Sequence, residues 1–248
     1  MKIAFFVSSA INLDDSPEDI SYKKRSVYTA EERLMQTQFT LSNINFACPG
    51  ADIFLMDVSK NAEEYKARLQ YVPNLDFSCL ETIDPESANL ARTTNSKGLA
   101  ETINTCKFLT TYYGKLRDYD FIIKISGRYF FNNFDTTLFV EENKNSTFFR
   151  QVPMPFWNSD WGIPELFKKD DYLAWAFTAT YAIGKYKLDN YFSACMDMLD
   201  YYKLNTTLAE ILPYESAFYH FVIQKQNFLP INWIINGWGS HGGGFSQW

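Results

Sequence analysis

Short apolar runs alternate with longer amphipathic segments along the first half of the chain. The runs at residues 2–8, 51–58, 75–80 and 121–123 have the length and composition of buried strands. Between them, apolar residues recur at helical spacing, most clearly over residues 98–113. This alternation predicts an α/β fold with a mostly parallel central sheet flanked by helices.

Local signals locate the ends of the first helix. Thr29 and Glu32 form a capping box, which predicts a helix that continues to about Phe46. Pro49 and Gly50 then break that helix. The other elements expected are a loop over 13–24, helices over 61–71, 188–202 and 214–224, and strands over 146–152, 176–184 and 228–235. No repeat or linker divides the chain, so we expect a single domain.

The predicted sheet directs attention to a few polar positions. In open α/β sheets, ligands bind beyond the carboxyl ends of the strands. That rule selects Ser8 and Ser9, Asp57, residues 124–128 and the loop after Phe77.

Charge and composition exclude some classes of function. The chain has 248 residues, of which 46% are hydrophobic, as expected of a globular protein with a large core. Its net charge of −6 argues against nucleic-acid binding, which usually requires a basic face. Aromatic residues make up 18% of the chain, and this high share hints at ligand binding because aromatic rings form platforms for sugars and bases.

The cysteines and the apolar runs bear on metal binding and location. Cys48, Cys79, Cys106 and Cys195 are widely spaced, so we expect free thiols in a reducing compartment and no zinc cluster. The apolar run at the N-terminus is too short for a signal peptide, and no run approaches the ~20 residues of a membrane span. We therefore expect a soluble, cytoplasmic protein, for which peripheral association with a membrane stays open.

Two polar segments carry the clearest chemistry. Residues 94–104 are Thr-Asn-Ser-Lys-Gly-Leu-Ala-Glu-Thr-Ile-Asn, and residues 118–129 are Asp-Tyr-Asp-Phe-Ile-Ile-Lys-Ile-Ser-Gly-Arg-Tyr. A helix that starts near Gly98 presents free N–H groups and a positive dipole end, which can receive a diphosphate. Lys97 adds positive charge there. A simple capping role for Gly98 and a solvated Lys97 are the alternative.

In these segments the chain resembles the GT-A glycosyltransferases, which place a helix with spaced Asn and Gly residues before a strand that carries an Asp-x-Asp motif. The resemblance implies one GT-A-like, Rossmann-like domain over 1–248, with a nucleotide-sugar-binding half at 1–135 and an acceptor-binding half with a C-terminal tail at 136–248. It also implies transfer of a sugar, with inversion, from a nucleotide-diphosphate sugar to a glycan hydroxyl in surface-polysaccharide or glycoconjugate synthesis. A UDP-sugar is the expected donor.

The resemblance and the strand ends together assign donor-binding roles. The expected donor contacts are Ser8, Ser9, Asp57, Asn95, Lys97, Gly98, Lys124, Ser126, Gly127 and His241. Asp57 suits ribose hydroxyls or a uracil N–H because a carboxylate only accepts hydrogen bonds, and capping of the next helix is an equal alternative. His241 lies in a glycine-rich tail, which is either a lid over the donor or a disordered end.

The chain departs from the family where the metal is expected. Residues 124–128, Lys-Ile-Ser-Gly-Arg, stand in place of Asp-x-Asp, whose carboxylates hold a divalent metal that neutralises the leaving diphosphate. The planar guanidinium of Arg128 matches phosphate oxygens, so we expect it to do part or all of the metal's work. A structural salt bridge from Lys124 or Arg128 to Asp118, Asp120 or Asp135 is the alternative. Binding of Mn²⁺ or Mg²⁺ through other carboxylates also stays open.

An inverting transfer needs a base that takes the proton of the acceptor hydroxyl. The family places this residue at a late helix start, where Glu215 follows Pro213, so Glu215 is the candidate base. Stabilisation of the helix by an acid in its first turn is the alternative. The rival acids are Asp160, Glu165, Asp170 and Asp171.

Two other functions stay open. A sugar nucleotidyltransferase normally has a glycine-rich basic loop after the first strand, which residues 7–10, Val-Ser-Ser-Ala, do not provide. A protein that binds nucleotide sugars without catalysis is compatible with the missing Asp-x-Asp.

Overall fold

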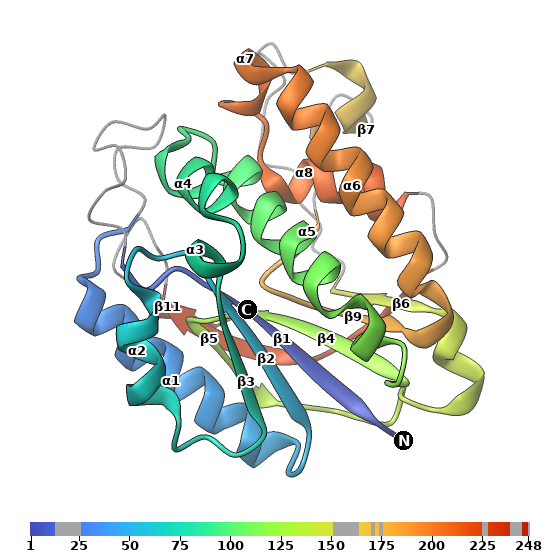
Figure 1. The fold of residues 1–248 in the computed structure, drawn as a ribbon. Helices are drawn as coiled ribbons and strands as arrows, with labels where there is room; N and C mark the ends of the chain where they lie inside the picture. The colour runs from blue at the N-terminus through green and yellow to red at the C-terminus, as the bar shows by residue number, and fades with distance from the viewer. Residues whose placement is uncertain are drawn as a thin grey trace.

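A mixed sheet of seven strands lies at the centre of the computed structural model (Figure 1). The structure describes residues 1–12, 26–150, 164–169, 172–173, 176–224, 228–238 and 245–247. The strands of this sheet are β1 (Ile3–Ser9), β2 (Asp52–Asp57), β3 (Leu75–Cys79), β4 (Phe121–Ser126), β6 (Thr147–Phe149), β9 (Thr180–Gly184) and β10 (Phe228–Pro230). Their order across the sheet is β10-β6-β9-β4-β1-β2-β3.

Most pairings in this sheet are parallel. Strands β1 to β4 all run in one direction, with β1 between β2 and β4. Strand β9 is antiparallel to both β4 and β6, and β10 is parallel to β6. The predicted α/β class is confirmed, and so is the central place of the strand that ends near Lys124.

A second, smaller sheet corrects the prediction of one last strand over residues 228–235. That segment forms two strands, β10 and β11 (Ile234–Trp238), because Pro230 lacks the N–H that would continue the ladder. Strand β11 pairs with β5 (Tyr129–Asn133) and β12 (Phe245–Gln247), both antiparallel. The chain segment that follows Arg128 is thereby tied to the C-terminal part of the protein.

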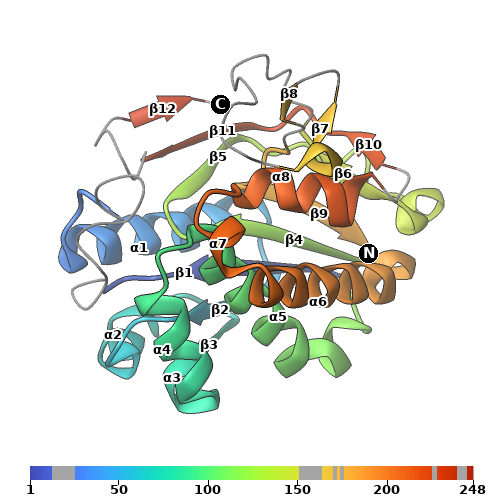
Figure 2. The same cartoon turned by 90° about the horizontal axis from the view of Figure 1, so that it is seen from above.

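Helices cover the large sheet on both faces. They are α1 (Ala30–Ala47), α2 (Ala62–Leu69), α3 (Leu80–Ile83), α4 (Pro85–Thr93), α5 (Lys97–Leu116), α6 (Leu188–Leu204), α7 (Thr206–Ala209) and α8 (Tyr214–Phe218), the last continued by a π-helical turn at Tyr219–Ile223. A short hairpin is formed by β7 (Lys168–Lys169) and β8 (Tyr172–Leu173). Figure 2 shows α3 to α6 on one side of β1 and the β5–β11–β12 sheet on the other.

Alternation along β1 builds a core on each face of the sheet. Ala4 and Phe6 point to the α5 and α6 side, where Phe6 stacks on Phe108 of α5. Phe5 and Val7 belong to the other core, which includes residues of α1, α2, β5 and β11. Strand β1, apolar as far as Val7, is therefore buried on both faces, as expected of a parallel strand between helices.

The ends of two helices follow directly from side-chain chemistry. The predicted capping box is confirmed: Glu32 N donates to Thr29 Oγ1 at 3.3 Å, and Thr29 N donates to Glu32 Oε2 at 2.8 Å. At the start of α5, Leu99 N donates to the Oγ of Ser96 at 3.0 Å. A side-chain cap thus already satisfies one of the free N–H groups at this helix end.

Gly98 lies in the first turn of α5, where it packs against α6. A Cβ at this position would stand 2.8 Å from Cζ of Tyr202 and 3.2 Å from the carbonyl oxygen of Leu212, and it would overlap the Tyr202 hydroxyl. The Tyr202 side chain is fully buried and its hydroxyl donates to that carbonyl, so it has no room to move. Gly98 is therefore required for the close approach of two helices, a reason independent of any ligand.

Gly98→Ala is expected to lower the free energy of unfolding by roughly 1–3 kcal/mol, the usual cost of overpacking a core. Gly114 is the matched control, because it lies in the same helix and an added Cβ there has no neighbouring atom within 4 Å. Gly114→Ala is expected to raise stability by roughly 0.5–1 kcal/mol through helix propensity. Urea unfolding of both variants measures the difference, and equal stability of the two would contradict the packing argument.

The structure also bears on the expectations about cysteines, membrane spans, metal clusters and the first long loop. All four cysteines are free thiols, with Cys48 half-buried and the other three buried. No helix among the described residues is long and apolar enough to cross a membrane. In the same part of the chain, no three or more His, Cys, Asp and Glu side chains group as a metal site. The predicted loop over 13–24 lies outside the described residues.

Candidate functional site

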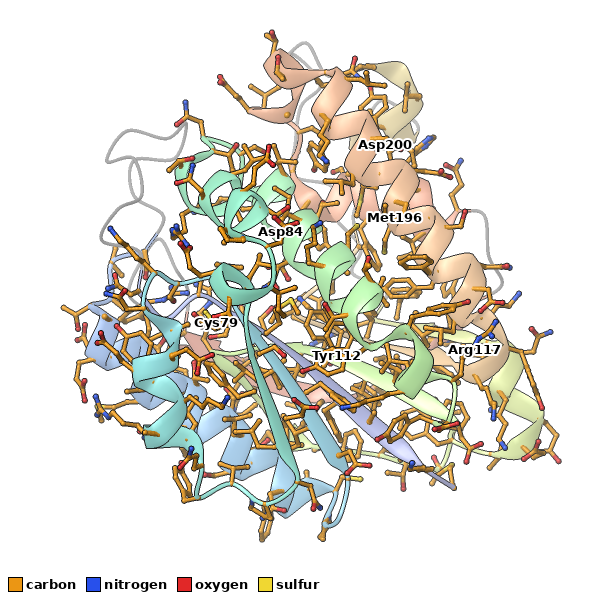
Figure 3. The ribbon with its side chains drawn as sticks, in the orientation of Figure 1. Cys79, Asp84, Tyr112, Arg117, Met196 and Asp200 are labelled. Atoms are coloured by element: carbon orange, nitrogen blue, oxygen red, sulfur yellow. The ribbon has the colours of Figure 1, made fainter. Side chains whose placement is uncertain are left out.

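The strand order reverses between β1 and β4. From β1 the chain proceeds to β2 and β3 on one side and then returns to β4 on the other side. Ligands of open α/β sheets bind at the carboxyl ends of the strands at such a reversal. At this end of the sheet, Ser8 of β1 pairs in register with Ser126 of β4. Cys79, labelled in Figure 3, marks the same end of the neighbouring strand β3. The topology places the candidate site at these residues.

Gly127 follows β4 directly and makes close backbone contacts with β1 and α1. Its N–H donates to the Ser8 carbonyl at 2.8 Å, and its own carbonyl accepts from Thr37 Oγ1 of α1 at 3.1 Å. An added Cβ would lie 3.2 Å from that hydroxyl oxygen. The position of Arg128 is therefore determined by contacts of the preceding residue with both β1 and α1.

Arg128 is half-buried and forms no ion pair with any residue that the structure describes. Its backbone carbonyl accepts from Trp238 N of β11 at 3.2 Å, and its guanidinium lies 5.6 Å from the centre of the Tyr129 ring. Its Nη1 is buried without a hydrogen-bond partner among the described residues. The suggested salt bridge to a nearby aspartate is not formed, since Asp120, for example, pairs with Lys144. A bound water or anion is one group that would satisfy such a buried donor.

A second guanidinium lies beside Arg128. Arg33 of α1 donates from Nε to the carbonyl oxygen of Ala10 at 2.5 Å. Burial and the positive charge of Arg128 lower the pKa of Arg33 to about 9, while the negative charge of Asp57 acts in the opposite direction. Arg33 thus stays protonated at neutral pH, and the two like charges repel each other. An anion between them would relieve this repulsion.

Lys124 has a structural role in this site. It is 3% exposed and donates to Ser126 Oγ at 2.9 Å and to the Thr178 carbonyl at 2.8 Å, and it forms an ion pair with Glu101 Oε1 at 2.9 Å. An ammonium group has three N–H donors, so none remains for a phosphate. The salt-bridge alternative was correct in kind, although the partner is Glu101 and not an aspartate.

Glu101 was missed as a candidate. Its Oε1 accepts from Ser8 Oγ at 2.9 Å and from Lys124, and its side chain is 28% exposed. Burial raises its pKa, but the charge of Lys124 and the bonds from Lys124 and Ser8 outweigh burial, so the pKa of Glu101 is lowered. The available signal was its place in the polar segment 94–104, within the first turns of α5.

Glu215 contributes a second acid from α8. Pro213 is the N-cap of this helix and not its first residue, and Glu215 lies in the first turn. Burial raises the pKa of the half-buried Glu215 carboxyl, and the negative charge of Glu101 raises it further, against the charges of Lys124 and Lys97. These electrostatic interactions show that Glu215 belongs to the same charged cluster as Glu101.

Asp57 binds backbone N–H groups of two loops. It is fully buried, and its two oxygens accept from Ile11 N at 3.1 Å and Ser59 N at 2.8 Å. The helix-capping alternative was wrong, because Asn61 is the N-cap of α2. Asp57 ties together the loops that follow β1 and β2, so a role in contacting the donor would be indirect.

For the other residues predicted to contact the donor, the structure gives only their position and exposure. Ser9 is buried at the end of β1, Asn95 is exposed, and Lys97 is half-buried in the first turn of α5. His241, Asp160, Asp170 and Asp171 lie outside the described residues. Glu165 starts a 3-10 turn, Glu165–Phe167.

The structure thus brings together Ser8, Glu101, Lys124 and Ser126 on the α5 side of the strand ends, and Arg33 and Arg128 on the α1 side. On the first side Lys124 and Glu101 form an ion pair, whereas neither guanidinium on the second side forms an ion pair with a described residue. This arrangement can bind an anion and has a protonatable acid close by. A comparison of the chain with protein-family models found no match, and a comparison with curated proteins found none either.

Proposed function

We propose that the chain is a glycosyltransferase that moves a sugar from a nucleotide-diphosphate sugar to an acceptor hydroxyl. The observation that supports this most is the Arg128 guanidinium at the strand reversal, with a buried Nη1 that lacks a partner among the described residues and with Arg33 beside it. Paired guanidiniums suit a diphosphate because each presents a fork that matches phosphate oxygens.

In this proposal the two arginines stabilise the negative charge that grows on the leaving diphosphate. Glu215 accepts the proton of the acceptor hydroxyl while that oxygen bonds to the anomeric carbon and the bond to the diphosphate breaks. A raised pKa suits a general base, because its conjugate acid is then closer in strength to the group it deprotonates. The donor is proposed to be a UDP-sugar and the acceptor a glycan, as the resemblance implies.

A divalent metal does not fit the described residues at the Asp-x-Asp position. Ser126, Gly127 and Arg128 offer no carboxylate there. Of the acids at the strand ends, Glu101 has its Oε1 bound by Lys124 and Ser8 and keeps only Oε2 for a ligand, and both oxygens of Asp57 accept backbone N–H groups. Cationic side chains are therefore proposed to do the metal's work.

A panel of nucleotide sugars tests the function directly. A bound donor at 100 times its Kd is expected to stabilise the protein by about 2.7 kcal/mol, which thermal melts detect. UDP should also stabilise it, whereas uridine, which has no diphosphate, should not. Release of UDP from one UDP-sugar, accelerated by a glycan acceptor, is the expected activity.

Other results of the same panel would indicate other functions. Formation of pyrophosphate from UTP and a sugar phosphate would identify a nucleotidyltransferase. Stabilisation without turnover for any acceptor would identify a binding protein. No stabilisation by any nucleotide diphosphate would refute the proposed site.

A further inference from the structure

Glu101 has no part in the proposed chemistry, yet it lies within the site. Its Oε1 has two partners, Ser8 and Lys124, while no hydrogen bond joins Oε2 to any residue that the structure describes. The Glu101 side chain is 28% exposed, so a ligand can reach part of it. One oxygen of an ionised carboxylate is thus left to accept hydrogen bonds.

The carboxylate is held rigidly. Lys124 is 3% exposed and uses its other two donors on Ser126 Oγ and the Thr178 carbonyl, at 2.9 and 2.8 Å. Ser8 supplies a second bond to Oε1, from the strand next to β4. Neighbouring strands thus fix the orientation of the Glu101 carboxylate. A carboxylate that is already oriented loses little conformational entropy when a ligand binds, and this favours selective recognition.

The position of Glu101 relative to Arg128 indicates what it would meet. The Arg128 charge is close enough to contribute to the lowered pKa of Glu101, after the larger effects of burial, Lys124 and Ser8. In a nucleotide-diphosphate sugar the sugar is bonded to the terminal phosphate. With that diphosphate on Arg128, the sugar is the next group, and Glu101 lies on the opposite side of the strand ends from Arg33.

We propose that Glu101 selects the donor sugar: its Oε2 accepts hydrogen bonds from hydroxyls of a neutral sugar and disfavours a sugar that carries a carboxylate. An ionised carboxylate accepts hydrogen bonds but donates none, so it binds a hydroxyl and repels another carboxylate. This inference rests on the proposed function and assigns it a substrate class, the uncharged hexoses.

Pairs of donors that differ only at carbon 6 test the inference. Calorimetry would give Kd values for UDP, UDP-glucose, UDP-glucuronate, UDP-galactose and UDP-galacturonate. For the wild type, the preferred neutral hexose donor is expected to bind at least 10-fold more tightly than its uronate, in line with a hydrogen bond to a charged group. Glu101→Gln should reduce this preference to less than about 3-fold, because an amide also donates hydrogen bonds.

Two further variants control for charge and folding. Glu101→Gln leaves Lys124 buried without its counter-ion, which can unfold the protein. The double variant Glu101→Gln with Lys124→Met removes both charges and is expected to show the same loss of preference. Glu86→Gln, on the exposed surface of α4, removes one negative charge elsewhere and should keep the wild-type preference.

The outcomes separate this inference from the proposed function. Wild-type protein that binds UDP and a UDP-hexose but does not distinguish the hexose from its uronate would refute the role of Glu101 and leave the function standing. Retention of a 10-fold preference in the double variant would also refute that role. Failure of the wild type to bind any nucleotide diphosphate would refute the function, and the inference with it.

Discussion

Arg128→Ala is expected to lower the turnover of sugar transfer by roughly 100-fold or more, the range typical of removing one donor from a developing negative charge. The reason is that Arg128 has a buried donor without a partner among the described residues, at the strand reversal where the diphosphate is proposed to bind. The side chain makes no ion pair within the described chain that its removal would break. Thermal melts should therefore show a folded variant with nearly the wild-type Tm.

Arg128→Lys distinguishes charge from geometry. A lysine restores the positive charge but not the planar fork, so turnover should recover only partly. Measurements with and without EDTA complete the test, and the wild type is expected to keep most of its activity under chelation. Complete loss of activity with EDTA, together with near-normal turnover of folded Arg128→Ala, would show that a metal held by other carboxylates stabilises the leaving group.

Glu215→Gln is expected to lower kcat by roughly 10²–10⁴-fold, the usual contribution of a general base. The amide has nearly the same size and cannot accept the proton, so donor binding should change little. Glu210→Gln is the matched control, because Glu210 is an exposed glutamate shortly before α8 and should keep full activity. Turnover near the wild-type level in folded Glu215→Gln would exclude it as the base.

The pH dependence gives a second test of Glu215. Burial raises the pKa of its carboxyl above the ordinary value of 4.5. A base acts in its ionised form, so kcat should rise with pH through this raised pKa and then level off. The neighbouring charges predict the direction of further shifts: neutralising Glu101 should move the rise to lower pH, and neutralising Lys97 should move it to higher pH. A wild-type kcat that does not rise with pH in the acidic range would contradict the assignment of Glu215 as the base.

The parallel part of the fold could be predicted because its signals are local. Residues 3–9 and 52–57 are apolar runs bounded by polar residues, and Thr29 with Glu32 closes a capping box within one turn. Strand β5 was missed, because its partner β11 lies far along the chain and nothing near Tyr129 indicates that pairing. Helix α4 was also missed, although Asp84 caps it and Pro85 takes its first position.

The candidate site was predictable in place but not in detail. The rule for strand ends selected Ser8 and residues 124–128, and these do lie together. Which charges pair was not predictable, because the partner of Lys124 depends on how α5 packs over β4. Asp57 accepts hydrogen bonds from backbone N–H groups of two loops. This role could not be predicted, because the two loops come together only in the folded chain.

The bond between Trp238 N and the Arg128 carbonyl has a consequence for synthesis of the protein. During translation the strands β1 to β4 leave the ribosome first, and they can pair before the C-terminal part exists. The Arg128 carbonyl gains this last bond only when β11 arrives and pairs with β5. A nascent chain could therefore pair β1 to β4 well before the C-terminal contact at the candidate anion site forms.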